Sequence, residues 1–173
     1  IGEKTANRGW NYATHTLRQP GSSFKPLAVY APALEMGYIT PGSVVDDYPY
    51  DVLGGRSWPV NSGAARYRGL TTIYSALTRS VNTVAVRVLA DYVTPTASFE
   101  FVRDHFHITS LEENLQIGDQ IYNDYGLSQL ALGGLTTGVN TLEMAAAYAT
   151  FPNNGVYSES RTYTQVLGRD DNI

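Results

Sequence analysis

Apolar positions recur at helical spacing in several parts of the chain. Between residues 22 and 36 they predict a helix whose apolar face comprises Phe24, Leu27, Ala28, Ala31 and Leu34. Gly37 follows where a C-terminal cap is expected. Pro26 falls in the first turn, where proline is tolerated, and Pro32 is expected to kink the helix.

Further helices are predicted downstream. Thr71 or Thr72 is expected to cap a short helix through Leu77, and residues 83–92 form a second helix after a polar break at 79–82. Thr94-Pro95 is typical of a cap and first helical position, and it opens an amphipathic helix that carries Phe99, Val102 and Phe106. Thr141 is expected to cap a strongly helical run over residues 142–151.

The remaining segments are rich in turn signals. Residues 38–69 are expected to be mostly irregular because they carry the turn signals Gly54-Gly55, Trp58-Pro59 and Asn61-Ser62-Gly63. Residues 108–140 are expected to be so because they are rich in glycine, asparagine and aspartate. Residues 161–167 alternate as a strand does, and a turn is expected at 168–172. A strand and a turn with no returning strand suggest a truncated domain, and helix is expected to exceed strand.

Composition excludes several functional classes. The charge sum is 12 basic minus 16 acidic residues, or −4, with no basic run, which argues against nucleic acid as a partner. The absence of cysteine excludes disulfides, thiolate zinc sites, iron–sulfur clusters and a cysteine nucleophile. The longest apolar stretch, residues 144–151, is far shorter than the ~20 residues of a membrane span. Any export signal or anchor is therefore expected outside this chain.

The sharpest chemical feature is Ser22-Ser23-Phe24-Lys25 near a predicted helix start. Ser22 and Lys25 would lie one turn apart on one face, where a desolvated, neutral lysine could take the hydroxyl proton. The chain has only one other lysine, Lys4, and only one Ser-x-x-Lys match. Taken alone, the tetrapeptide is a weak signal and is more typical of an N-cap serine with a solvated lysine.

A second feature lies in the predicted corner between two helices. Ser80-Val81-Asn82 is the only Ser-x-Asn in the chain. A hydroxyl there could relay a proton, and an amide could hold both a lysine and a substrate carbonyl. A helix C-cap followed by an N-cap explains the same residues without any chemistry.

Together these motifs resemble the transpeptidase family of penicillin-binding proteins, and most of all the transpeptidase half of the bifunctional, class A members. The matching stretches are residues 17–27, 58–61, 69–71, 76–86, 132–134 and 138–149. Order and spacing fit, with Ser22 and Ser80 separated by 80 − 22 = 58 residues. Each motif is weak alone, and the ordered set carries the resemblance.

The resemblance implies an α/β (α+β) fold of the penicillin-binding-protein and serine β-lactamase type, with an antiparallel sheet, flanking helices and a helical subdomain. Residues 1–173 would be a partial transpeptidase domain, mostly its helical part, that lacks the C-terminal strands and the Lys-Thr-Gly motif. Lys4-Thr5-Ala6 lies in the wrong segment to replace that motif. The chain alone is therefore expected to be inactive and to expose large apolar surfaces.

The resemblance also implies a reaction and its residues. Ser22 would form an acyl-enzyme with a peptidoglycan stem peptide ending in D-Ala-D-Ala, and β-lactam antibiotics would acylate the same hydroxyl. Lys25 would be the base, Ser80 a proton relay, and Asn82 the group that orients Lys25 and the acyl-chain amide. No metal or organic cofactor is implied, and the setting would be the extracytoplasmic face of a bacterial membrane.

Two other interpretations remain open from the residues. A D,D-carboxypeptidase or a serine β-lactamase would use the same Ser-Lys pair, with water resolving the acyl-enzyme. A non-catalytic cell-wall-binding module, in which Ser22 is only a helix cap, would form no covalent adduct. The missing C-terminal segment of the same domain is a further expected partner.

Overall fold

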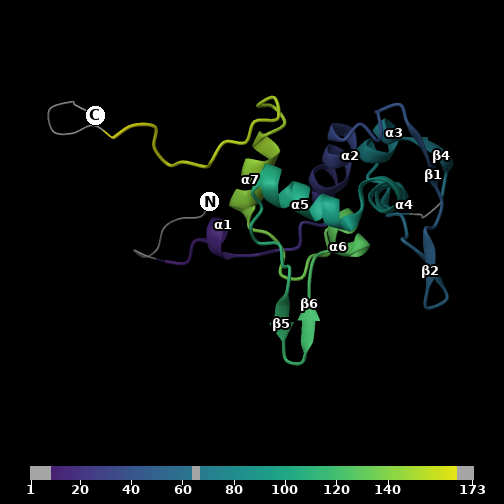
Figure 1. Cartoon of the computed structure of the whole chain (residues 1–173), viewed down its shortest axis with the longest axis horizontal. Helices are drawn as coiled ribbons and strands as arrows, with labels where there is room; N and C mark the ends of the chain where they lie inside the picture. Colours follow the sequence, from purple (N-terminus) through teal and green to yellow (C-terminus); the bar gives the residue numbers. More distant parts are fainter. Residues whose placement is uncertain (1–8, 64–66, 167–173) are drawn as a thin grey trace.

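The computed structural model describes residues 9–63 and 67–166, and helices are its main regular structure (Figure 1). In chain order the elements are α1 (Tyr12–His15), the 3-10 helix η1 (Gly21–Phe24), the π-helix η2 (Pro26–Tyr30), α2 (Ala31–Glu35), β1 (Val44–Asp47), β2 (Asp51–Leu53), β3 (Arg56–Trp58), β4 (Gly69–Thr72), α3 (Ile73–Thr78), α4 (Asn82–Arg87), the π-helix η3 (Val88–Val93), α5 (Pro95–Phe106), β5 (Leu115–Ile117), β6 (Gln120–Tyr122), α6 (Leu127–Leu132) and α7 (Thr141–Ala149). The expected excess of helix over strand is confirmed.

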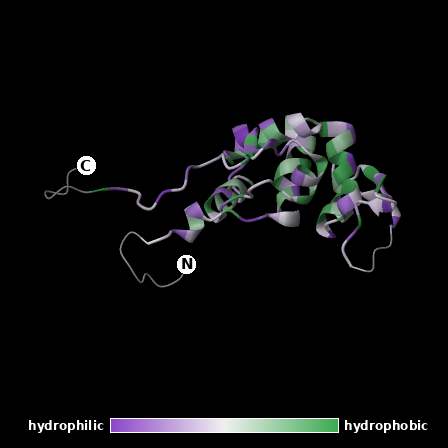
Figure 2. Ribbon diagram, turned by 90° about the horizontal axis from the view of Figure 1, so that it is seen from below, coloured by the Kyte–Doolittle hydropathy of each residue, from purple (hydrophilic) through white to green (hydrophobic). Residues whose placement is uncertain are grey.

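Helix α4 lies at the centre of the packing. Its residues Thr83, Val84, Ala85 and Val86 are fully buried, as expected of a helix that other elements cover on several sides. Strand β1 and helices α3, α6 and η3 all contact it. Figure 2 shows apolar residues concentrated on the helices.

The helix predicted over residues 22–36 is present as the continuous succession η1, η2 and α2. Phe24, Leu27 and Ala28 of its predicted apolar face are buried in the core and Ala31 packs against it, whereas the prediction is wrong for Leu34, which is 40% exposed. Gly37 ends the segment with a positive φ of 71°. The disturbance expected at Pro32 takes the form of a change from π to α geometry at Ala31, since proline has no N–H to donate. Ser98 of α5 donates a hydrogen bond to the Ala28 carbonyl of this segment.

The predicted helix pair around residues 79–82 is confirmed. Thr72 caps α3, its hydroxyl accepting from the Ser75 N–H at 3.2 Å. Helix α4 and the π-helix η3 together cover the predicted second helix. Helix α5 opens after Thr94 as predicted, with Phe99, Val102 and Phe106 buried.

Helix α7 begins one residue earlier than expected. Asn140, and not Thr141, is its N-cap: the Asn140 side chain accepts from the Glu143 N–H at 2.8 Å, and the Glu143 carboxylate accepts in return from the Asn140 N–H at 3.4 Å. This capping box outcompetes the threonine hydroxyl because it satisfies two backbone donors at once. The helix ends at Ala149.

Short strands replace much of the irregular structure expected over residues 38–69 and 108–140. Strands β1 and β4, β2 and β3, and β5 and β6 form three separate antiparallel pairs, and α6 is an additional helix. Each strand has only three or four residues, too few for a periodic pattern to stand out. In Figure 1 the β5–β6 hairpin extends away from the helices.

The prediction of a strand over residues 161–167 is wrong for residues 161–166, which the structure describes. Residues 161–166 form no strand and run extended beyond α7 (Figure 1), because no other described segment pairs with them. Leu167 and the turn expected at 168–172 lie outside the described residues. In residues 9–63 and 67–166, no helix is long and apolar enough to span a membrane.

Large apolar side chains are exposed on several elements, in line with the expectation of an uncovered surface. Those more than half exposed include Val44, Val52, Leu70, Tyr74 and Ile121. Leu70 of β4 is 80% exposed. Val44 and Leu70 lie on the same exposed face of the β1–β4 pair.

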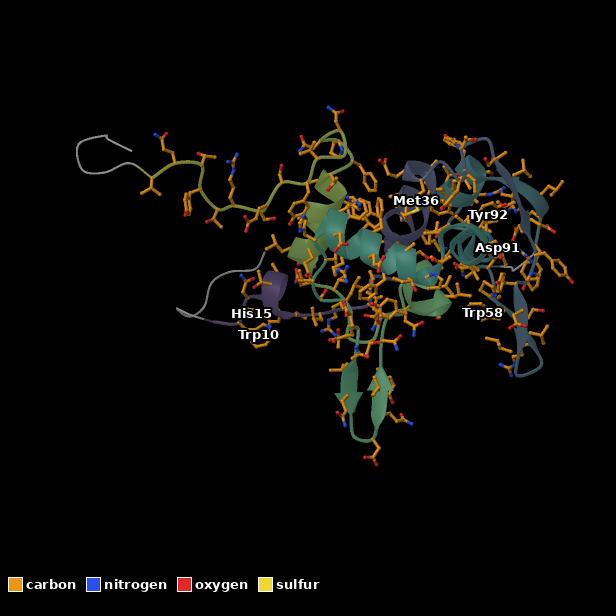
Figure 3. All side chains as sticks on the ribbon, viewed as in Figure 1. Trp10, His15, Met36, Trp58, Asp91 and Tyr92 are labelled. Carbon is orange, nitrogen blue, oxygen red and sulfur yellow. The ribbon has the colours of Figure 1, made fainter. Side chains whose placement is uncertain are left out.

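The segment before η1 runs along the start of α7. Trp10 and His15 lie side by side at α1 (Figure 3), with their rings edge-on and 5.2 Å apart. Arg18 then pairs with Val139 through two backbone hydrogen bonds of 2.9 Å. The chain is thus anchored four residues before Ser22.

We predict that Asn140→Ala lowers the free energy of unfolding by about 1 kcal/mol. The Glu143 N–H would lose its acceptor, and the capping box would lose one of its two reciprocal hydrogen bonds. Urea unfolding of the chain measures this free energy. Asn11→Ala is the matched control: Asn11 caps the four-residue α1, which buries no residue, so its loss should have a smaller effect. Equal effects of the two substitutions would contradict the importance of the α7 cap.

Candidate active site

Ser22 lies exposed in η1, directly before the buried part of the helical segment. The N–H of Lys25 donates to the Ser22 carbonyl, so the two residues are one turn apart. The hydroxyl of Ser22 makes no hydrogen bond to another described residue, whereas the neighbouring Ser23 hydroxyl donates to the Pro20 carbonyl at 2.6 Å. Ser22 is therefore open to a reaction partner.

Helices α6 and α7 hold the backbone around Ser22. The Gly21 N–H donates to the Gly133 carbonyl at 3.2 Å, immediately after α6. The Tyr148 hydroxyl of α7 donates to the Ser23 carbonyl at 2.7 Å. Contacts on both sides of Ser22 thus come from residues more than a hundred positions later in the chain.

Gly133 permits this close approach. It ends α6 with a φ of 69°, and a Cβ atom there would lie 2.1 Å from the Gly21 carbonyl oxygen. Only glycine satisfies both the backbone conformation and the spacing. In the sequence, the Gly133-Gly134 pair is the signal for this contact. It indicates the end of a helix only when α6 is known to precede it.

Lys25 is buried, with 1% of its surface exposed. Its ammonium donates to the Ser80 carbonyl at 2.8 Å, to the Ser80 hydroxyl at 3.1 Å and to the Asn82 Oδ1 at 2.5 Å. All three donors of the ammonium are therefore used. The solvated lysine that the tetrapeptide alone allowed is wrong.

The surroundings of Lys25 favour its neutral form. Its three acceptors are uncharged oxygens, and burial removes water from the ammonium, lowering the pKa of Lys25 from 10.5 to about 8. A fraction of the side chain is consequently a neutral amine at physiological pH, able to accept a proton. Among the described residues, no hydrogen bond joins the Ser22 hydroxyl to the Lys25 amine.

Ser80 and Asn82 reach Lys25 from the corner between α3 and α4. The Ser80 N–H donates to the Leu77 carbonyl and the Val81 N–H to the Ala76 carbonyl, a Schellman motif in which Ser80 has a φ of 53°. Ser80 thus ends α3, as the capping interpretation allowed, and turns its carbonyl and hydroxyl toward Lys25.

Asn82 does not act as the helix cap that the sequence alone allowed. The N-cap of α4 is Val81, whose own side chain makes no capping hydrogen bond. The Asn82 amide instead accepts from Lys25 and donates to the Val60 carbonyl at 2.7 Å. The structure therefore brings Lys25, Ser80 and Asn82 together and leaves Ser22 one turn away.

A cavity of about 580 Å³ adjoins this corner and is lined in part by Asn61, Tyr67, Arg79 and Ser80. Its size suits a small organic molecule or a short peptide segment. Throughout the part of the chain that the structure describes, no three His, Cys, Asp or Glu side chains form a metal-binding group.

Comparison with known proteins assigns the family. The model of the penicillin-binding protein transpeptidase domain matches residues 3–171. Penicillin-binding protein 1A of Clostridium botulinum is 33% identical over 98% of this chain, and penicillin-binding protein 4 of Bacillus subtilis is 36% identical over 91%. The chain belongs to the penicillin-binding protein transpeptidase family.

Solved structures agree with this assignment. The crystal structure of penicillin-binding protein 1A from Haemophilus influenzae has a TM-score of 0.63 and 35% identity over 83% of this chain and 19% of its own. The penicillin-binding protein PonA1 from Mycobacterium tuberculosis has a TM-score of 0.69 and 27% identity over 92% of this chain and 39% of its own. The α/β transpeptidase fold, represented here mostly by helices, is thereby confirmed.

The chain spans only part of these relatives. It covers 20% of the Clostridium botulinum protein and 23% of the Bacillus subtilis protein. The family assignment therefore concerns the part of each relative that this chain matches, and not the rest of those proteins.

We predict that Gly133→Ala destabilises the chain by about 1–3 kcal/mol more than Gly155→Ala, because its methyl group would overlap the Gly21 carbonyl. Gly155 is the matched control: its φ of 80° is also left-handed, but a Cβ there meets nothing within 4 Å. Urea unfolding of both variants gives the difference, and equal losses would show that Gly133 matters only for its backbone conformation.

Proposed function

We propose that this chain carries the nucleophile and base of a serine D,D-transpeptidase that cross-links peptidoglycan outside the bacterial membrane. The observation that carries the proposal is the buried Lys25, hydrogen-bonded to Ser80 and Asn82 and one turn from the exposed Ser22. Membership of the transpeptidase family supports the substrate class.

In the proposed acylation, the Ser22 hydroxyl oxygen attacks the penultimate D-Ala carbonyl of a stem peptide. Neutral Lys25 takes the hydroxyl proton, and Ser80 passes a proton to the leaving nitrogen, so D-Ala departs as a neutral amine. Asn82 holds Lys25 and the amide of the acyl chain. An amine of a neighbouring stem then attacks the ester carbonyl, which forms the cross-link and returns the proton to Ser22.

A third motif completes the site in this proposal. The family's Lys-Thr-Gly strand is absent from the chain, whose lysines are Lys4 and Lys25 alone. We call this chain together with a segment that supplies Lys-Thr-Gly the complete domain. Loss of one oxyanion donor costs about 10²–10³ in rate, so the 173-residue chain alone is expected to be inactive.

The β-lactam ring offers a direct test, since it would acylate the same hydroxyl. The complete domain should gain the mass of one penicillin, measured by intact-mass spectrometry, and Ser22→Ala should abolish the gain. Ser23→Ala is the matched control and should still be labelled, because the Ser23 hydroxyl is engaged with Pro20.

Three outcomes separate the alternatives. No adduct on the complete domain would contradict the proposal and favour a cell-wall-binding module. Rapid loss of the adduct would indicate a β-lactamase, whereas a long-lived adduct agrees with a transpeptidase. Labelling of the 173-residue chain alone would contradict its expected inactivity.

The rate of acylation should rise with pH. Below its pKa Lys25 is mostly protonated and cannot act as a base, so the rate should increase about tenfold per pH unit and level off above the pKa. The midpoint is expected at about 8 or lower, because a second lysine near the site would lower the pKa of Lys25 further. Stopped-flow acylation between pH 6 and pH 9 measures the profile, and a flat profile would rule out Lys25 as the base.

A further inference from the structure

Asp47 is a buried carboxylate that does not belong to the hydrogen-bonded group of Lys25, Ser80 and Asn82. It ends β1, where exposed and buried residues alternate, and only 1% of its surface is exposed. Its oxygens accept from the Asn61 side chain at 2.7 Å, from the Arg68 N–H at 3.0 Å and from the Thr83 hydroxyl at 2.5 Å. A buried carboxylate is stable when donors satisfy it in this way.

Asn61 connects Asp47 to the start of α4. While its NH₂ group donates to Asp47, its Oδ1 accepts from the backbone N–H of Asn82 at 2.9 Å and of Thr83 at 3.3 Å. These N–H groups belong to the first turn of α4, which no side chain of its own caps. Asn61 thus replaces the missing cap, and Asp47 fixes which way its amide points.

The same loop also fixes the Asn82 side chain. Its NH₂ group donates to the carbonyl of Val60, the residue before Asn61, and its Oδ1 is thereby aimed at the Lys25 ammonium. Asp47 is not among the hydrogen-bond acceptors of Lys25. The hydrogen-bonded connection from Asp47 toward Lys25 therefore runs through Asn61, and through Thr83 at the start of α4, to Asn82.

We infer that Asp47 is a positioning residue for the reaction: through Asn61 it sets the backbone and side chain of Asn82, and so the placement of Lys25. This inference rests on the proposed function for its catalytic consequence. Asp47 must be a carboxylate in this role, because all its partners are donors. An isosteric asparagine would direct its own NH₂ group at one of them.

The test compares Asp47→Asn and Asn61→Ala with Asp46→Asn. Asp46 is the matched control, since it is the preceding acidic residue of β1 and faces solvent. In the complete domain, both network variants should slow penicillin acylation by about 10- to 100-fold with little change in the dissociation constant of the initial complex, as expected from a misplaced base. Asp46→Asn should match the wild type.

A double variant tests whether the two residues act together. Because Asp47 and Asn61 are hydrogen-bonded to each other, the rate losses of Asp47→Asn and Asn61→Ala should combine to clearly less than their product in the double variant. Multiplying rate losses would show two independent effects and overturn the inference.

A second readout is independent of catalysis. The chain has two lysines, so ¹³C labelling at the lysine ε-carbon gives two NMR signals, and Lys25 can be titrated directly. Asp47→Asn should admit water to Lys25 and move its pKa from about 8 toward 10.5. A fall in the Lys25 pKa would instead indicate simple loss of a nearby negative charge and would overturn the positioning role.

Failure of this inference is distinguishable from failure of the proposed function. If the wild-type complete domain is never acylated, the proposed function fails, and the NMR titration alone decides whether Asp47 positions Lys25. If the wild type is acylated and Asp47→Asn reacts at the same rate while unfolding at a lower temperature, Asp47 is only structural and the inference is wrong.

Discussion

The burial of one lysine constrains the rest of the site. An ammonium group removed from water is unstable unless every donor finds an acceptor, and Lys25 finds three, all uncharged and all from Ser80 and Asn82. The corner between α3 and α4 must therefore present a carbonyl, a hydroxyl and an amide oxygen to one point. The left-handed conformation of Ser80 is the local consequence, since a straight helix could not turn these groups inward.

Two independent supports keep the halves of the site in place. Gly133 and Tyr148 hold the backbone on either side of Ser22, and they belong to the region of α6 and α7. Asp47 and Asn61 hold the start of α4, and they belong to β1 and the loop before β4. The nucleophile and the base are thus held by different parts of the chain, which also contact each other directly where α6 packs against α4.

Helices with long apolar stripes could be predicted from the sequence, because burial of Phe24 and Leu27, or of Phe99 and Val102, leaves a period of 3.6 in the pattern. The short strands and α6 could not, since three to six residues carry no period. The order of the motifs indicated Lys25, Ser80 and Asn82 together. The sequence did not indicate Asp47, because a buried acid differs from its exposed neighbour Asp46 only by its partners in space.

The contacts that hold Ser22 have a consequence for the timing of biosynthesis. Ser23 and Tyr148 are separated by 125 residues, and the ribosome adds about 5–20 residues per second, so roughly 6–25 s pass between the synthesis of the two partners. During that interval the emerging Ser22 segment lacks its later contacts, and its apolar side chains are available to chaperones. Closure of such long loops is slow, so this part of the site is expected to be among the last to form.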